Sequence, residues 1–151
     1  MIGRPTARRL PVAALLLALL LALPLGACTD DSRTCETRFE PPEGFTQVET
    51  FEEEYEDHTG VRLSYQDERD RLLHAAAGIP GEWGETASPE GVVPLVSGGE
   101  ARLLAGIEGV WFAIWDEGDR CDPRVLIGNG FERPEFMSAL EDAGIASPSS
   151  G

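Results

Sequence analysis

The three cysteines are the residues whose chemistry this sequence defines best. Cys28 follows an apolar run at residues 10–25 and two small residues, and arginines precede that run. A positively charged start, an apolar stretch and a small-residue end are the parts of a secretory signal. The run has about 16 residues, whereas a helix that spans a membrane needs about 20. We therefore expect export, and we favour it over a retained transmembrane helix.

The residues Leu25-Gly26-Ala27-Cys28 resemble the lipobox of bacterial lipoproteins, in which an aliphatic residue and two small residues precede a cysteine. The resemblance implies that the Cys28 thiol receives a diacylglyceryl group and that the chain is cut just before it. Two acyl chains anchor a protein stably, whereas one gives marginal binding. We therefore expect a signal peptide at residues 1–27 and a lipoprotein on the extracytoplasmic face of the cell membrane. The alternative is an ordinary secretory signal.

If Cys28 is lipidated, Cys35 and Cys121 remain. An exported domain with two remaining cysteines most simply pairs them in a disulfide. A loop of this length gives a stabilisation of roughly 4 kcal/mol in the chain-entropy model. The seven residues from Cys28 to Cys35 span at most about 25 Å, which would hold the domain close to the membrane. Free thiols and an intermolecular bridge are the alternatives.

Other reactive side chains do not form a recognisable motif. The two histidines, His58 and His74, lack the local spacing of a metal site. Three aspartates between residues 116 and 122 could suit calcium, but an acidic turn needs no ion. No serine lies in a Gly-x-Ser-x-Gly pattern, Cys35 has no CxxC companion, and there is no lysine. We therefore expect neither catalysis nor a metal or cofactor.

The charge of the chain limits its partners. Without residues 1–27 it has nine arginines and 27 acidic residues, a formal net charge of −18. Such a chain repels phosphate backbones, so we expect no nucleic-acid partner. Abundant Ala, Gly, Arg and Glu without lysine is typical of a GC-rich genome, as in actinobacteria, and haloadaptation is the alternative.

The second half of the chain predicts three strands. Residues 102–107 and 110–115 are apolar runs separated by Glu108-Gly109, which suits a tight hairpin turn. The run 110–115 is apolar on both faces, so we expect a central strand covered on both sides. An acidic turn separates it from the next strand, at residues 124–127.

A helix is predicted after the Gly128-Asn129-Gly130 break. Pro134 fits the first turn, and Gly144 fits the C-terminal cap. The residues that share one face at helical spacing are Phe136, Met137, Leu140 and Ala143.

The first half of the chain is harder to assign. Residues 61–65 alternate like a strand with one wet face. Residues 51–55 would be its hairpin partner, with Phe51 and Tyr55 facing inward. A helix over residues 46–57 is the alternative, because glutamates favour helices. Residues 71–77 are expected to form another strand.

Together these elements predict an α+β fold, a mainly antiparallel β-sheet (a meander) with a C-terminal helix packed on one face. We expect a lipid-anchored tether at residues 28–44, one domain at 45–145 and a disordered tail at 146–151. The order of elements over residues 110–140 resembles a domain of unknown function in bacterial envelope and anti-sigma-factor proteins. That resemblance implies a shape related to periplasmic lipoprotein carriers.

Trp83 is the candidate interaction residue. It lies in a glycine-rich loop, and tryptophan is enriched at binding hot spots. Alternatively, it folds back to cap the sheet. We expect a non-catalytic binding or interaction module whose partners are the membrane, through the lipid, and an unknown protein. The alternative is a carrier of a lipid-like or other apolar ligand, held in a pocket between sheet and helix.

Overall fold

The structure is a computed structural model that describes residues 33–148. The leader, the expected lipobox (Leu25, Gly26, Ala27) and Cys28 lie outside the described residues. Within residues 33–148 the chain forms seven strands and one helix. They are β1 (Thr46–Glu54), β2 (Thr59–Gln66), β3 (Leu72–Ala77), β4 (Ser88–Pro94), β5 (Glu100–Ala105), β6 (Val110–Trp115), β7 (Arg124–Asn129) and α2 (Arg133–Asp142).

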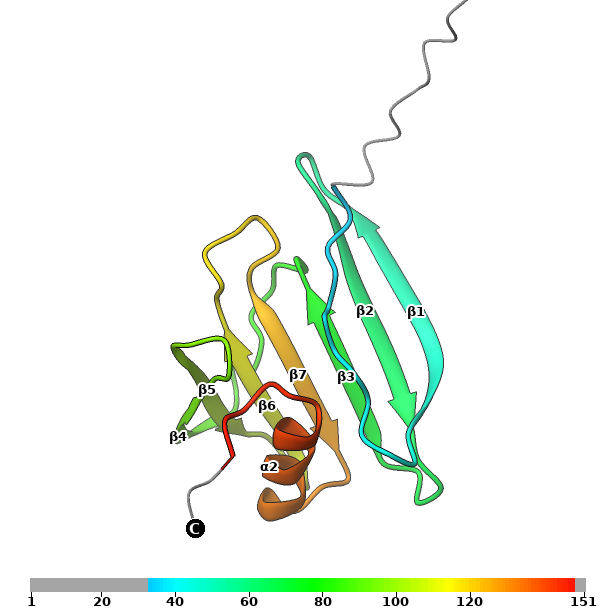
Figure 1. Cartoon of the computed structure of the whole chain (residues 1–151), viewed down its shortest axis with the longest axis vertical. Helices are drawn as coiled ribbons and strands as arrows, with labels where there is room; N and C mark the ends of the chain where they lie inside the picture. The colour runs from blue at the N-terminus through cyan, green and yellow to red at the C-terminus, as the bar shows by residue number, and fades with distance from the viewer. Residues whose placement is uncertain (1–32, 149–151) are drawn as a thin grey trace, which may run out of the picture. The chain divides into compact units, whose positions relative to one another are not determined.

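All seven strands belong to one antiparallel sheet with the order β1-β2-β3-β7-β6-β5-β4. Two meanders, β1-β2-β3 and β4-β5-β6-β7, are joined where β3 pairs with β7. Helix α2 lies on one face of this sheet, over its β6–β7 side (Figure 1). The predicted α+β class with a C-terminal helix on the sheet is confirmed.

The face of the sheet that carries α2, here called the helix face, holds the larger core. Phe136 and Leu140 of α2 are fully buried against Leu73 of β3 and Leu126 of β7. Trp111 packs at the edge of this core, and its indole N–H donates to the Phe131 carbonyl at 3.0 Å. Side chains therefore fill the space between the helix and the sheet.

The opposite face, here called the loop face, is covered by the β3–β4 connection. Ile79 from this connection packs against Ile114, Val125 and Leu104. Trp83 is partly buried against the same cluster, and its indole N–H donates to the Ile79 carbonyl at 2.9 Å. Strand β6 is thus covered on both faces, as its apolar sequence predicts.

The predicted hairpin is confirmed, because residues 46–54 form strand β1 and pair with β2. The alternative helix over residues 46–57 is wrong. The expected inward orientation of Phe51 is wrong, because its side chain is 40% exposed. Strand β1 is an edge strand, so Phe51 has a neighbour on one side only, and it packs under the Arg62 guanidinium at 5.0 Å from the ring centroid. Tyr55 is partly buried and stacks on His58.

Strand β4 is not predicted from the sequence. Its residues Ser88–Pro94 contain two prolines and a glycine, which are depleted in strands. They are tolerated here because β4 lies at the edge of the sheet, where one side of the backbone needs no partner.

The packed domain extends beyond residues 45–145 at both ends. Cys35 and Phe39, from the expected tether, are only 2% and 8% exposed. Ala146, from the expected tail, is 1% exposed, and the Ser147 N–H donates to the Pro94 carbonyl. Both segments are mainly polar, so their composition does not indicate these few buried contacts. Among the described residues no helix is long and apolar enough to cross a membrane.

Gly128 allows α2 to approach β7 closely, and this gives a test of the packing. A Cβ atom at Gly128 would lie 2.5 Å from Cδ2 of Phe136. Gly128→Ala should therefore lower the free energy of unfolding by about 1–3 kcal/mol, as overpacked cores do. Gly81→Ala is the matched control, because its Cβ would meet nothing closer than 3.6 Å. Equal urea-unfolding midpoints for the two variants would contradict the packing described here.

Candidate binding groove

The N-terminal segment, residues 33–45, runs across the helix face of the sheet (Figure 1). A disulfide fixes its start, since Cys35 is bonded to Cys121 with 5.5 Å between the Cα atoms. The Cys35 N–H also donates to the Thr59 carbonyl at 2.8 Å, and Thr34 forms a parallel bridge with Thr59. The predicted pair of cysteines is therefore brought together, and it holds the segment beside β2.

Two further contacts hold the middle of the N-terminal segment. The ring of Phe39 packs on Tyr65 with 5.2 Å between the centroids. Arg124, which is 4% exposed, donates to the Glu36 carbonyl and pairs with the Asp119 carboxylate at 3.0 Å and with Glu117 at 3.4 Å. Because Arg124 is so deeply buried, these contacts offset the cost of desolvating its charge.

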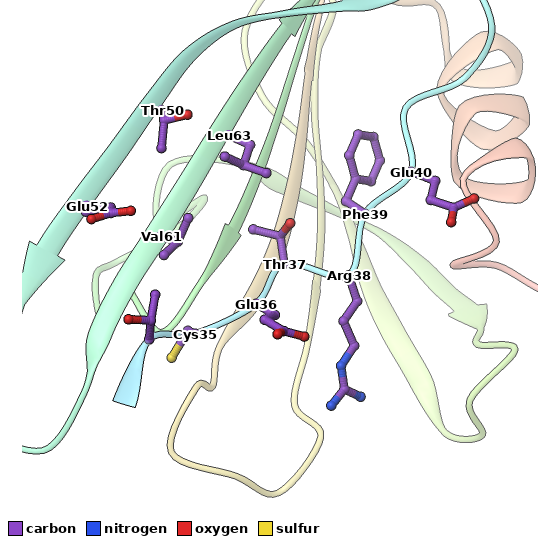
Figure 2. A pocket seen from close by; sticks show the side chains of 11 residues that line it. Cys35, Glu36, Thr37, Arg38, Phe39, Glu40, Thr50, Glu52, Val61 and Leu63 are labelled. Atoms are coloured by element: carbon purple, nitrogen blue, oxygen red, sulfur yellow. The ribbon is translucent and has the colours of Figure 1, made fainter. Parts of the chain in front are cut away.

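A groove of about 500 Å³ lies between the N-terminal segment and the β1–β2 hairpin. Val61 and Leu63 of β2 form its apolar floor, and Thr50 and Glu52 of β1 stand on one side (Figure 2). The N-terminal segment forms the opposite wall through residues 34–40. The groove therefore combines an apolar floor with a polar rim.

The charged groups of this rim are mainly acidic. Glu36, Glu40 and Glu52 line the groove together with a single cation, Arg38. Arg38 is itself paired with Glu117 at 3.8 Å. The groove therefore suits a ligand that presents apolar groups to the floor and positive or neutral groups to the rim.

Glu49, Ser64 and His74 meet on the loop face, across β1, β2 and β3. The Ser64 hydroxyl lies 2.8 Å from Nδ1 of His74 and 3.4 Å from the Glu49 carboxylate. In a catalytic triad the histidine bridges serine and acid, whereas here the serine lies between them. Ser64 is 2% exposed, and burial, with the Arg62 charge nearby, lowers the pKa of His74. The three groups connect neighbouring strands, and their geometry is not that of a triad.

His58 holds the β1–β2 hairpin to the end of β3. Its Nδ1 lies 2.7 Å from the Asp57 carboxylate, and its Nε2 lies 2.6 Å from the carbonyl of Gly78. Both partners are acceptors, so the doubly protonated ring satisfies both. The Asp57 carboxylate and the Gly78 carbonyl raise the pKa of His58, against the opposing effects of desolvation and of Arg120.

The remaining predicted residues have structural contacts. The Asp122 carboxylate accepts three backbone N–H bonds in the acidic turn, and Asp119 pairs with Arg124. Within residues 33–148 no group of three or more His, Cys, Asp or Glu side chains is placed to hold a metal ion. Trp83 packs on the loop face, and its role in an interaction stays a prediction.

The groove is not predicted from the sequence, because its outer wall lies in the residues expected to form a tether. One feature of the sequence does indicate that this segment packs on the sheet. Phe39 is a large apolar residue in a polar stretch, four residues after Cys35. A disulfide at Cys35 brings such a residue onto the sheet.

Comparison with protein-family models, with curated proteins and with solved structures finds no match to this chain.

The protonation of His58 gives a pH-dependent test. A pKa raised by folding gives a stabilisation that is fully present below the pKa of the unfolded chain and is lost as the pH rises through the folded value. His58→Gln should therefore cost more stability at about pH 5.5 than at about pH 8.5, on either side of the usual histidine range. Urea unfolding at the two pH values measures this difference. A cost that does not change with pH would contradict a charged His58 in the folded state.

Proposed function

We propose that this chain is an extracytoplasmic binding module, anchored to the membrane by a lipid on Cys28. The observation that carries the binding role is the groove of about 500 Å³, which has an apolar floor and an acidic rim. Concave sites with an apolar lining and a few polar groups are the usual form of binding sites. The anchor rests on the lipobox pattern in the sequence.

The position of the groove in the chain fits this role. Its first lining residue, Thr34, comes six residues after Cys28, which allows a separation of at most about 20 Å. A lipid on Cys28 would therefore keep the groove near the membrane surface. Ligands or partners within the membrane, or held close to it, are the ones such a module meets.

A non-catalytic role fits the described residues better than an enzymatic one. The groove is lined by carboxylates, hydroxyls and one guanidinium, and its cysteine is held in the disulfide. The serine and histidine that do lie together, Ser64 and His74, are on the opposite face of the sheet. These features support binding as the function of the groove.

A carrier of a lipid-like ligand is the second candidate, favoured by the volume of the groove. We place such a ligand in the groove, because Phe136 and Leu140 are fully buried between the helix and the sheet. The acidic rim fits a ligand with a positive or neutral head group better than an anionic lipid.

The anchor is tested by Cys28→Ser in the full-length chain. We expect the unchanged chain to sediment with membranes and to incorporate a fatty-acid label, and the variant to lose both properties. Cys35→Ser is the control, because it also removes one cysteine, the partner of Cys121, but leaves Cys28 unchanged. This control should stay membrane-bound and labelled. A membrane-bound, labelled Cys28→Ser chain would contradict the anchor.

The choice between module and carrier is tested by native mass spectrometry of the chain after expression in an oxidising compartment. A carrier retains the added mass of an apolar ligand, and Thr50→Trp should remove that mass by filling the groove. Glu90→Trp, on the exposed far edge of the sheet, is the matched control. A bare chain excludes a tightly held apolar ligand and leaves the binding module.

A further inference from the structure

The two edges of the sheet differ in how open they are to another strand. Strand β4 forms one edge, and it contains Pro89, Pro94 and a bulge before Gly91. Prolines and bulges are devices that stop an edge from pairing. Strand β1 forms the other edge, contains no proline, and is exposed along all nine of its residues. Its bulge lies between Gln47 and Glu49, so the ladder is regular over residues 50–54. Strand β1 is therefore the edge that can accept a further strand.

The ladder between β1 and β2 shows which backbone groups of β1 are free. The Tyr55 N–H donates to the His58 carbonyl at 2.8 Å and closes the hairpin loop. Facing pairs in an antiparallel ladder alternate between bonded and non-bonded. Counting back from Tyr55, the residues whose N–H and C=O point away from β2 are Glu54, Glu52 and Thr50.

Two of these residues, Thr50 and Glu52, connect this edge to the groove. Thr50 faces Leu63 and Glu52 faces Val61 across the ladder, and all four side chains line the groove. Successive side chains of a strand point to opposite faces. A strand paired to Thr50 and Glu52 would therefore direct every second side chain to the side of the sheet on which the groove opens (Figure 2).

The charge of β1 selects among possible strands. Glu49, Glu52, Glu53 and Glu54 lie within its nine residues, and Arg62 contacts only the first of them, at 3.5 Å. Like charges placed opposite each other destabilise a strand pair, whereas opposite charges stabilise it. Two copies of β1 would bring two sets of four glutamates to one seam, so a second copy of this chain is disfavoured. A strand with lysine or arginine is favoured.

We propose that β1 binds an extended segment of a partner protein by strand addition, and that this segment alternates basic and apolar residues. The inference rests on the proposed function, since it names the class of partner for the binding module. Main-chain hydrogen bonds to Thr50, Glu52 and Glu54 give the affinity, and the glutamates with the apolar floor give the specificity.

The probe is a blocked nonapeptide of alternating lysine and valine, and a glutamate–valine peptide is its control. Each is added to the chain expressed from its full-length sequence, with hydrogen exchange followed by mass spectrometry. We expect the basic peptide to slow exchange in β1 and the acidic peptide to have no effect. Absence of binding, equal binding of both peptides, or protection elsewhere than β1 would overturn the proposal.

Two kinds of variant, proline and glutamine substitutions, separate the backbone contribution from the charge. Glu52→Pro removes an outward N–H without breaking the ladder to β2, so it should weaken peptide binding at least tenfold, while unchanged exchange in β3 and β7 confirms folding. Thr50→Pro is the second variant if the first does not fold. A segment whose apolar residues face the groove places its basic residues beside Glu49 and Glu53 on the loop face. Glu53→Gln should therefore weaken binding roughly two- to fivefold, and Glu90→Gln, on the opposite edge, should not. Wild-type binding by both proline variants would overturn strand addition.

Self-association and the proposed function are distinguished in the same material. Sedimentation that shows a dimer through β1 at high salt, abolished by Glu52→Pro, would replace the basic partner with a second copy of this chain. Failure of the peptide to bind, in a chain that keeps its lipid and a groove ligand, overturns strand addition and leaves the proposed function standing. A chain that lacks the lipid but still binds the basic peptide through β1 overturns the anchor of the proposed function and leaves strand addition standing.

Discussion

The Cys35–Cys121 disulfide is the constraint on which the rest of this arrangement depends. It joins the start of the described chain to the β6–β7 loop, 86 residues later in the sequence. A loop of that length corresponds to roughly 4–5 kcal/mol of denatured-state entropy. Gly78 packs so closely that a Cβ there would lie 2.6 Å from the Cys35 sulfur, and its N–H donates to the Cys121 carbonyl. The disulfide thus fixes the N-terminal segment, the end of β3 and the β6–β7 loop together.

This constraint divides the helix face of the sheet into a filled part and an open part. Over β6 and β7, the side chains of Phe136 and Leu140 of α2 are fully buried in the larger core. Over β1 and β2, within residues 33–148, the cover is the N-terminal segment, which carries Phe39 into the core and Phe45 against its edge. A single extended segment cannot cover two strands, and the groove is the space that it leaves.

The sequence predicts the parts of this fold whose patterns are local. The apolar runs of β6 and β7, the helix at Arg133–Asp142 and the β1–β2 hairpin all follow from periodicity and turn residues. Two features depend on position in the sheet, which the periodicity of the sequence does not indicate. They are the existence of strand β4 and the exposure of the Phe51 side chain. The groove depends on Phe39 and on a disulfide between distant residues, so its walls come together only in the folded chain.

The most direct test of this account is hydrogen exchange at residues 34–40 in the oxidised chain and in the chain with its disulfide reduced. The account predicts slow exchange at the Cys35 amide, which donates to Thr59, only while the disulfide is intact. After reduction this segment should exchange freely and the groove should lose its wall. Equal, slow exchange in both forms would show that other contacts hold the segment, and it would contradict the central role of the disulfide.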